Sequence, residues 1–253
     1  MRIRLFFCSL GLLATVLMAQ RPHDRGLGMG GHGFGGSLSR TPVTGAPYSA
    51  VETIQTQQLL ANGNQISHTE QANVYRDSQG RTRMEHTVTP PAASGKQPFT
   101  AITIVDPVAG YRYELNSAAM TAVQTPLPPA RTSAGNGPRP AAPSGADQPT
   151  LATVNLGTQT VNGVNATGTQ VTETIPAGAF GNAQPIQVVR VTWISTDLKV
   201  PVQVKSSDPR FGTRDLELTS IVPSEPTASL FVVPSNYTVT TGHGGFSGPG
   251  HKK

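Results

Sequence analysis

Cysteine, charged residues and aromatic residues are all scarce in this sequence of 253 residues. The only cysteine, Cys8, lies inside an apolar amino-terminal run, so the chain after that run has no disulfide, no thiolate metal site and no cysteine nucleophile. Charged residues make up only 13% of the chain, and the basic ones are scattered singly. Because nucleic-acid binding needs clustered basic residues as well as a high pI, we expect no nucleic-acid partner.

The common catalytic and cofactor motifs are absent as well. The sequence has no nucleophile elbow, no zinc-protease motif, no phosphate-binding loop and no spaced carboxylate cluster. His68 and His86 lie on expected strands near Glu70 and Glu85, an arrangement that is common by chance. The other histidines lie in glycine-rich segments with no ligand spacing: His23, His32, His243 and His251. We therefore expect no catalytic residue, no metal site and no cofactor, and a protein that is not an enzyme.

The amino terminus has the layout of a secretory signal peptide. Arg2 and Arg4 precede an apolar run from Leu5 to Ala19, after which the sequence turns polar. Such a run is too short to stay as a membrane span. We expect residues 1–19 to be removed on export, which places the protein in the periplasm or outside the cell with no stable membrane span.

Three low-complexity stretches divide the remaining chain. Residues 20–47 and 241–253 are rich in glycine and histidine, and residues 126–149 are rich in proline and alanine. None of them holds enough large apolar side chains to offset the entropy of ordering it. We expect two flexible arms and a disordered insertion within one β domain, residues 48–240, because each half alone is short of core.

Alternation of polar and apolar residues predicts strands in 48–125 and 150–240. Val200, Val202 and Val204, for example, alternate with polar residues or proline. No long window shows helical periodicity. The expected fold is mainly β: a single antiparallel curved sheet, or an open half-barrel, of about ten strands.

Two turns carry the same Asp-Pro-x-x-Gly pattern, Asp106–Gly110 and Asp208–Gly212. In each turn the aspartate can accept hydrogen bonds from the downstream backbone, the proline presets the first turn dihedral and the glycine supplies a positive φ. We expect both aspartates to set hairpins rather than to carry chemistry. Gly212→Ala is expected to cost about 1 kcal/mol through the positive φ.

Trp193, the only tryptophan, lies on an expected strand with Val189 and Val191 on the same face. A packed core residue is the default interpretation of a lone tryptophan, and the alternative is that it lines an apolar cavity, since barrel-like sheets often hold ligands on their inner face. With Tyr111 and Tyr113, these residues form our set of candidate ligand-lining side chains.

Several segments carry a family resemblance. They are Thr192–Val202, Ser207–Gly212, the closing Ser224–Tyr237 segment with its Leu-Phe-x-x-Pro pattern, Tyr75–Arg83 and Ile104–Pro107. Together they resemble a group of uncharacterised secreted bacterial proteins whose strand order is similar to that of the outer-membrane lipoprotein carrier LolA and the periplasmic sensor RseB. The resemblance implies an open half-barrel whose concave apolar face, lidded by helices, takes acyl chains. This chain shows no lid helices.

Two functional interpretations remain open at this point. In the first, the protein is a non-catalytic envelope or secreted protein whose concave sheet binds an apolar or amphiphilic group, with a lipid or another envelope component as its partner. In the alternative, it is a structural or interaction module with a solid core that acts through its Gly/His/Phe-rich arms.

Overall fold

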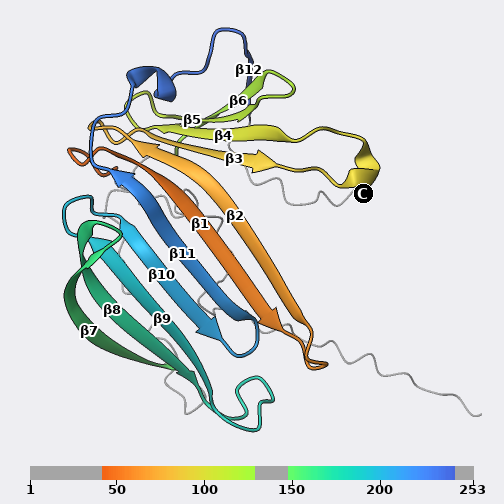
Figure 1. The fold of residues 1–253 in the computed structure, drawn as a ribbon, viewed down its shortest axis with the longest axis vertical. Helices are drawn as coiled ribbons and strands as arrows, with labels where there is room; N and C mark the ends of the chain where they lie inside the picture. The colour runs from red at the N-terminus through yellow and green to blue at the C-terminus, as the bar shows by residue number, and fades with distance from the viewer. Residues whose placement is uncertain (1–41, 129–147, 243–253) are drawn as a thin grey trace, which may run out of the picture. The chain divides into compact units, whose positions relative to one another are not determined.

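The computed structural model describes residues 42–128 and 148–242 (Figure 1). The expected signal peptide lies outside the described residues, as do most of both expected arms and most of the expected insertion. The strands are β1 (Tyr48–Leu59), β2 (Gln65–Arg76), β3 (Thr82–Val88), β4 (Phe99–Asp106), β5 (Tyr111–Asn116), β6 (Thr121–Pro126), β7 (Thr150–Val161), β8 (Val164–Ile175), β9 (Ile186–Ser195), β10 (Pro201–Asp208), β11 (Gly212–Val222) and β12 (Thr238–Thr241).

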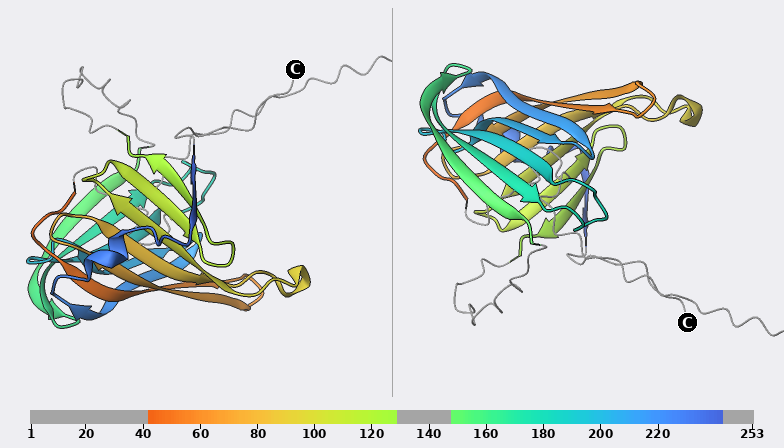
Figure 2. Two further views of the ribbon diagram at one scale, coloured as in Figure 1. Left: turned by 90° about the horizontal axis from the view of Figure 1, so that it is seen from above. Right: turned by 90° about the horizontal axis from the view of Figure 1, so that it is seen from below.

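These strands form one open, curved, 12-stranded sheet (Figure 2). Their order across the sheet is β12-β6-β5-β4-β3-β2-β1-β11-β10-β9-β8-β7. The mainly β prediction is therefore confirmed. Helical structure within the described residues is limited to two short 3-10 turns, η1 (Ala92–Ser94) and η2 (Ala228–Phe231).

The chain runs as two antiparallel meanders, β1–β6 and β7–β11, that meet where β1 pairs with β11 in the middle of the sheet. The expectation of about ten strands, all antiparallel, needs correction in one respect. β12 is an additional edge strand, and it pairs with β6 in parallel. Its four residues are all exposed and mostly threonine, so no alternation marks it in the sequence.

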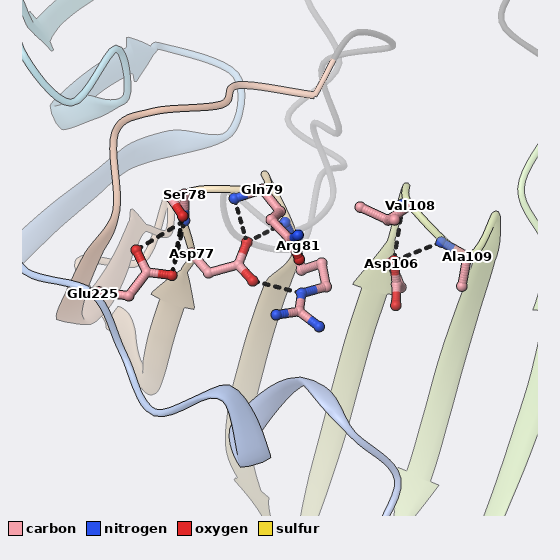
Figure 3. A network of polar contacts seen from close by, with 8 residues as sticks. All are labelled: Asp77, Ser78, Gln79, Arg81, Asp106, Val108, Ala109 and Glu225. Carbon is pink, nitrogen blue, oxygen red and sulfur yellow. Dashed lines mark hydrogen bonds and ion pairs between the residues drawn. The ribbon is translucent and has the colours of Figure 1, made fainter.

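The two Asp-Pro-x-x-Gly segments form the predicted turns. Asp106 Oδ1 accepts hydrogen bonds from the backbone N–H groups of Val108 at 2.9 Å and Ala109 at 2.8 Å (Figure 3). In the second turn Asp208 Oδ1 accepts from the N–H of Arg210 at 2.9 Å. The predicted hairpin role of both aspartates is confirmed, because each replaces solvent as the partner of its turn backbone.

Two clusters of buried apolar side chains form the core. The larger cluster lies at the end of the sheet that holds the β9–β10 turn, and the smaller one lies on β4, β5 and β6. Buried members of the larger cluster are Tyr48, Ala50, Val74, Val161, Ala166, Trp193, Leu198, Val200, Val202 and Leu218. Buried members of the smaller cluster are Ile102, Ile104, Leu115 and Ala122, against which Tyr113, Val233 and Tyr237 pack.

Residues 223–237, which we call the crossover segment, connect β11 to β12 across β3–β6. The backbone N–H of Ser78 donates to the Glu225 carboxylate at 3.1 Å (Figure 3). Further along, Arg83 Nη1 donates to the carbonyl oxygen of Leu230 at 2.8 Å. The crossover segment thus covers the smaller cluster without any long helix.

Residues 42–47, which the sequence assigned to the flexible arm, are anchored to the sheet by a buried arginine. Arg76 Nε donates to the carbonyl oxygen of Ala46 at 3.0 Å, and its Nη2 donates to the carbonyl oxygens of Ala46 and Leu198. The Arg76 guanidinium also lies 4.8 Å from the centroid of the Tyr48 ring. One side chain therefore ties the start of β1 to the β9–β10 turn.

This environment predicts a loss of stability at high pH. Burial raises the pKa of Tyr48 to about 12, although the positive charge of Arg76 acts in the opposite direction. Because this value lies above the ordinary 10.0, the stabilising contribution of neutral Tyr48 is complete below pH 10 and is lost as the pH rises toward 12. Across that window we expect the free energy of unfolding, from denaturant titration, to fall by about 2–3 kcal/mol more in the natural protein than in Tyr48→Phe. Equal losses in the two proteins would contradict this assignment.

Candidate ligand-binding face of the sheet

The register of the strands sorts the side chains of the sheet onto two faces. Glu52 of β1 is the partner of Leu218 of β11, and we call their side the Glu52 face. Glu217 precedes Leu218 and so points to the opposite side. Glu217 is the partner of Gln203 of β10, which is the partner of Trp193 of β9, and we call this side of the middle strands the Trp193 face. The register of β9 and β10 shifts between Pro201 and Gln203, and at this end of the sheet Trp193 is buried in the same cluster as Val202 and Leu218.

The two faces differ in polarity across the middle of the sheet. On the Glu52 face, Ile54, Leu216 and Val204 are consecutive partners in β1, β11 and β10, and the first two are buried. The sequence neighbours of these three residues point to the Trp193 face, and they are polar. They are Thr53 of β1, Glu217 of β11 and Gln203 of β10. The Glu52 face is therefore the more apolar and more buried side of these middle strands, although Trp193 itself is buried in the larger core cluster.

A row of charged and polar side chains interrupts the apolar surface of the Glu52 face. Arg190 of β9, Ser206 of β10 and Arg214 of β11 are consecutive partners, and Arg190 Nε donates to Ser206 Oγ at 3.4 Å. Glu52 and Glu173 are buried on the same face, with 2% and 8% of their surface exposed. The face thus combines aliphatic side chains with two guanidinium groups in adjacent rows.

All five predicted ligand-lining residues lie on the Trp193 face, but in two separate groups. Trp193, Val189 and Val191 follow one another along one side of β9, in register with Gln203 and its neighbours on β10. Tyr111 and Tyr113 lie on β5, in the other half of the sheet order. The sheet therefore does not place the two groups on neighbouring strands. Their role in lining a ligand stays a prediction.

Trp193 has the surroundings of a packed residue. Only 8% of its surface is exposed, and it belongs to the larger core cluster. Its direct partner on β8 is Gly168, where an added Cβ would lie 2.6 Å from atoms of the indole ring. The ring therefore occupies the space that a side chain at position 168 would need.

Tyr113 and Tyr111 differ from each other in burial. Tyr113 packs against the smaller cluster beside Val233 and Tyr237 of the crossover segment, and its hydroxyl accepts a hydrogen bond from Gln124 Nε2 at 3.3 Å. Tyr111 is 36% exposed, and the two tyrosine rings lie 6.3 Å apart. Only Tyr111 of this pair offers much surface to a ligand.

The row formed by Arg190, Ser206 and Arg214 was missed in the sequence because its members look like scattered single residues. The signal that could have found part of it is the predicted turn Asp208–Gly212. Counting outward from that turn, Ser206 and Arg214 fall opposite each other, as they do in the structure. The pairing of β9 with β10, which adds Arg190, involves a register shift near Pro201 that no local pattern indicates.

Other candidate sites of the sequence offer little chemistry. No group of His, Cys, Asp and Glu side chains within the described residues is arranged to hold a metal ion. His68 Nε2 lies 3.0 Å from Glu70 Oε1, and both side chains are exposed. His23, His32, His243 and His251 lie outside the described residues, and so do most residues of the arms on which the alternative interaction-module interpretation depends. The helices of the described residues are all too short to span a membrane.

No protein-family model matches this sequence, and no curated protein does. Among solved structures, the fold is similar to an uncharacterised conserved protein from Thermus thermophilus, with 13% identity and a TM-score of 0.39 over 78% of this chain and 90% of that one. A chain of the Pseudomonas aeruginosa MucA/MucB complex has 13% identity and a TM-score of 0.40 over 78% of this chain and 59% of that one. A LolA superfamily protein from Nitrosomonas europaea has 8% identity and a TM-score of 0.32 over 76% of this chain and 92% of that one. The predicted resemblance to the LolA and RseB group is confirmed as a weak one.

Proposed function

We propose that this protein is exported to the cell envelope and binds an amphiphilic, lipid-like ligand on the Glu52 face, without catalysing a reaction. One observation carries this proposal: a largely buried apolar row and a row with two arginines are adjacent on the same face of an open sheet. The apolar row consists of Ile54, Leu216 and Val204, and the arginine row consists of Arg190, Ser206 and Arg214.

The spacing of the two rows suits a molecule with an apolar tail and an anionic head. Successive residues on one face of a strand are about 7 Å apart, so a ligand lying along the strands would meet both rows at once. Aliphatic side chains would bind the tail by removing it from water. Guanidinium groups form strong, often bidentate hydrogen bonds to carboxylate and phosphate groups, so Arg190 and Arg214 would bind the head.

A matched pair of valine substitutions tests this proposal. Val204 lies on the Glu52 face and Val191 on the Trp193 face, both are half-buried, and both lie on inner strands. With a fluorescent fatty acid as the probe, we expect Val204→Gln to weaken binding by about tenfold or more, because a polar group enters the apolar row. Val191→Gln should lower the stability, because Val191 packs against the larger core cluster, but it should change the affinity by less than about twofold, since its neighbours on β10 are already polar.

Trp193 supplies a second readout because it is the only tryptophan. A ligand lined by Trp193, Val189 and Val191 would contact the indole ring and should shift its emission strongly. A ligand on the rows of Ile54 and Arg214 would reach Trp193 only through other members of the larger core cluster, so it should change the emission much less. If Val191→Gln weakens binding, Val204→Gln does not, and the emission shifts, the ligand lies on the Trp193 face. If the exported protein binds neither fatty acid nor phospholipid, the proposed function is wrong.

A further inference from the structure

Large apolar side chains are exposed at the end of the sheet opposite the larger core cluster. Figure 1 shows the turns after β1, β8 and β10 together at this end of the strands. Leu59, at the end of β1, is 74% exposed, and Ile66 lies just across that hairpin. Phe180 in the β8–β9 turn is 52% exposed, and Phe211 in the β10–β11 turn is 53% exposed. We call these four side chains the apolar rim.

The turns of the apolar rim adjoin one another. The Arg210 guanidinium lies 5.9 Å from the ring centroid of Phe180 and 5.0 Å from that of Phe211, so it links the β8–β9 turn to the β10–β11 turn. Gly212 touches the β1 backbone, because a Cβ on it would overlap the carbonyl oxygen of Gln57. The three turns therefore form one continuous end of the sheet.

The apolar rim carries almost no charge. Residues 60–64, 176–185 and 209–211 include no aspartate and no glutamate, and Arg210 is their only basic residue. The carboxylate nearest to these turns in the sequence, Asp208, is buried and paired with Arg210 at 2.7 Å. Burial acts to raise the pKa of Asp208, but the hydrogen bonds from Arg210 outweigh it and hold that pKa below its ordinary value. Contact with an apolar phase would therefore not strip water from an exposed carboxylate.

The backbone of the β8–β9 turn is satisfied from within. Asn182 Nδ2 donates to the carbonyl oxygens of Pro176 at 2.9 Å and Gln184 at 2.7 Å, and Asn182 Oδ1 accepts from the N–H of Phe180 at 3.0 Å. A lipid environment offers few partners to free backbone groups, so it tolerates only segments with such internal hydrogen bonds.

We propose that the apolar rim docks on the surface of a lipid bilayer, with Phe180 and Phe211 inserted at the boundary between headgroups and acyl chains. Exposed apolar groups of this size mark either membrane or protein contacts. A protein partner would need a contiguous patch with complementary shape and a polar rim of its own. The four side chains project from adjoining turns beside one arginine, and the β8–β9 turn satisfies its own backbone, so the apolar rim fits a fluid lipid interface better. This inference does not depend on the proposed ligand.

Local fluorescence at single positions tests the rim in the full chain. With Cys8→Ser in each protein, an environment-sensitive dye would be attached at Phe180→Cys, Phe211→Cys or, as the control, Val108→Cys. Val108 is 66% exposed in the β4–β5 turn at the other end of the sheet. On addition of phosphatidylcholine vesicles, with or without phosphatidylglycerol, we expect brighter, blue-shifted emission at positions 180 and 211 and no change at position 108. A local dye separates this contact from any membrane binding by the run Leu5–Ala19.

A second substitution measures how much the rim contributes. Phe211→Ser in the protein labelled at position 180 should raise the lipid concentration for half-maximal emission change by about tenfold, since one partly exposed phenylalanine is withdrawn from the apolar phase. The proposal is overturned if the dye at position 180 does not respond to vesicles, or responds no more than the dye at position 108. It is also overturned if position 180 responds only to a protein partner. Failure of fatty-acid binding would leave this result unaffected.

Discussion

Gly212→Ala should lower the free energy of unfolding by about 3 kcal/mol or more, well beyond the cost of a positive φ. Gly212 has a φ of +94°, and a Cβ there would overlap the Gln57 carbonyl oxygen and lie 3.0 Å from the Gln58 Cα. Both obstacles are backbone atoms of β1, so no side-chain rotation relieves them. The β10–β11 turn would have to move away from β1 to admit a methyl group.

The chain offers a matched control for this substitution. Gly110 ends the other Asp-Pro-x-x-Gly turn with a φ of +78°, and nothing lies within 4 Å of a Cβ built on it. Gly110→Ala should therefore cost only about 1 kcal/mol, the strain of the left-handed conformation. Denaturant titration of both variants separates the cost of the left-handed backbone, which both share, from the cost of overlap with β1, which only Gly212→Ala has. Equal losses would show that β1 does not obstruct position 212.

Trp193→Ala should cost about 3–5 kcal/mol, the usual range for deletion of a large buried aromatic side chain. The indole ring is buried in the larger core cluster and covers Gly168 on the neighbouring strand. Gly168→Ala should itself cost about 1–3 kcal/mol, because the rigid ring must shift to admit the methyl group. Thermal or denaturant unfolding measures both losses.

The double variant Gly168→Ala/Trp193→Ala tests whether these two losses share one cause. Once the ring is gone, the methyl group at position 168 meets no obstacle, and alanine also orders a strand at less entropic cost than glycine. We expect the double variant to be no less stable than Trp193→Ala alone, so the two effects should be strongly non-additive. If the stability losses of the two single variants instead add up in the double variant, the indole ring does not occupy the space beside Gly168.

The sequence predicted the strands and turns well because both depend on local chemistry. Alternation in segments such as Val200–Val204 and the Asp-Pro-x-x-Gly turns are short-range signals, and the structure contains the corresponding strands and hairpins. The excess cost now expected at Gly212 was invisible because it arises from Gln57, far away in the sequence. The parallel strand β12 was missed for the same reason, since only its partner β6 defines it.

The candidate site was harder to predict than the fold. Periodicity shows that Val189, Val191 and Trp193 share a face, but not whether that face is the apolar one. That depends on the strands beside them, and β10 presents Gln203 and Lys205 on that side. The large side chains drew attention to the Trp193 face, whereas the mixed character of the Glu52 face follows from partners on different strands.

The pairing of β1 with β11 has a consequence for how the molecule is made. Thr219 and Val51, which share a hydrogen bond across this pairing, are 168 residues apart, whereas the other long strands pair with their neighbours in the chain. The first meander can therefore assemble hairpin by hairpin while the second is still being made, and closing the long loop between them is expected to be the slow step of folding. Until then, β1 and β11 each present a bare edge of complementary shape. At high concentration, two chains could satisfy those edges by exchanging meanders, which makes a domain-swapped dimer the expected by-product of refolding.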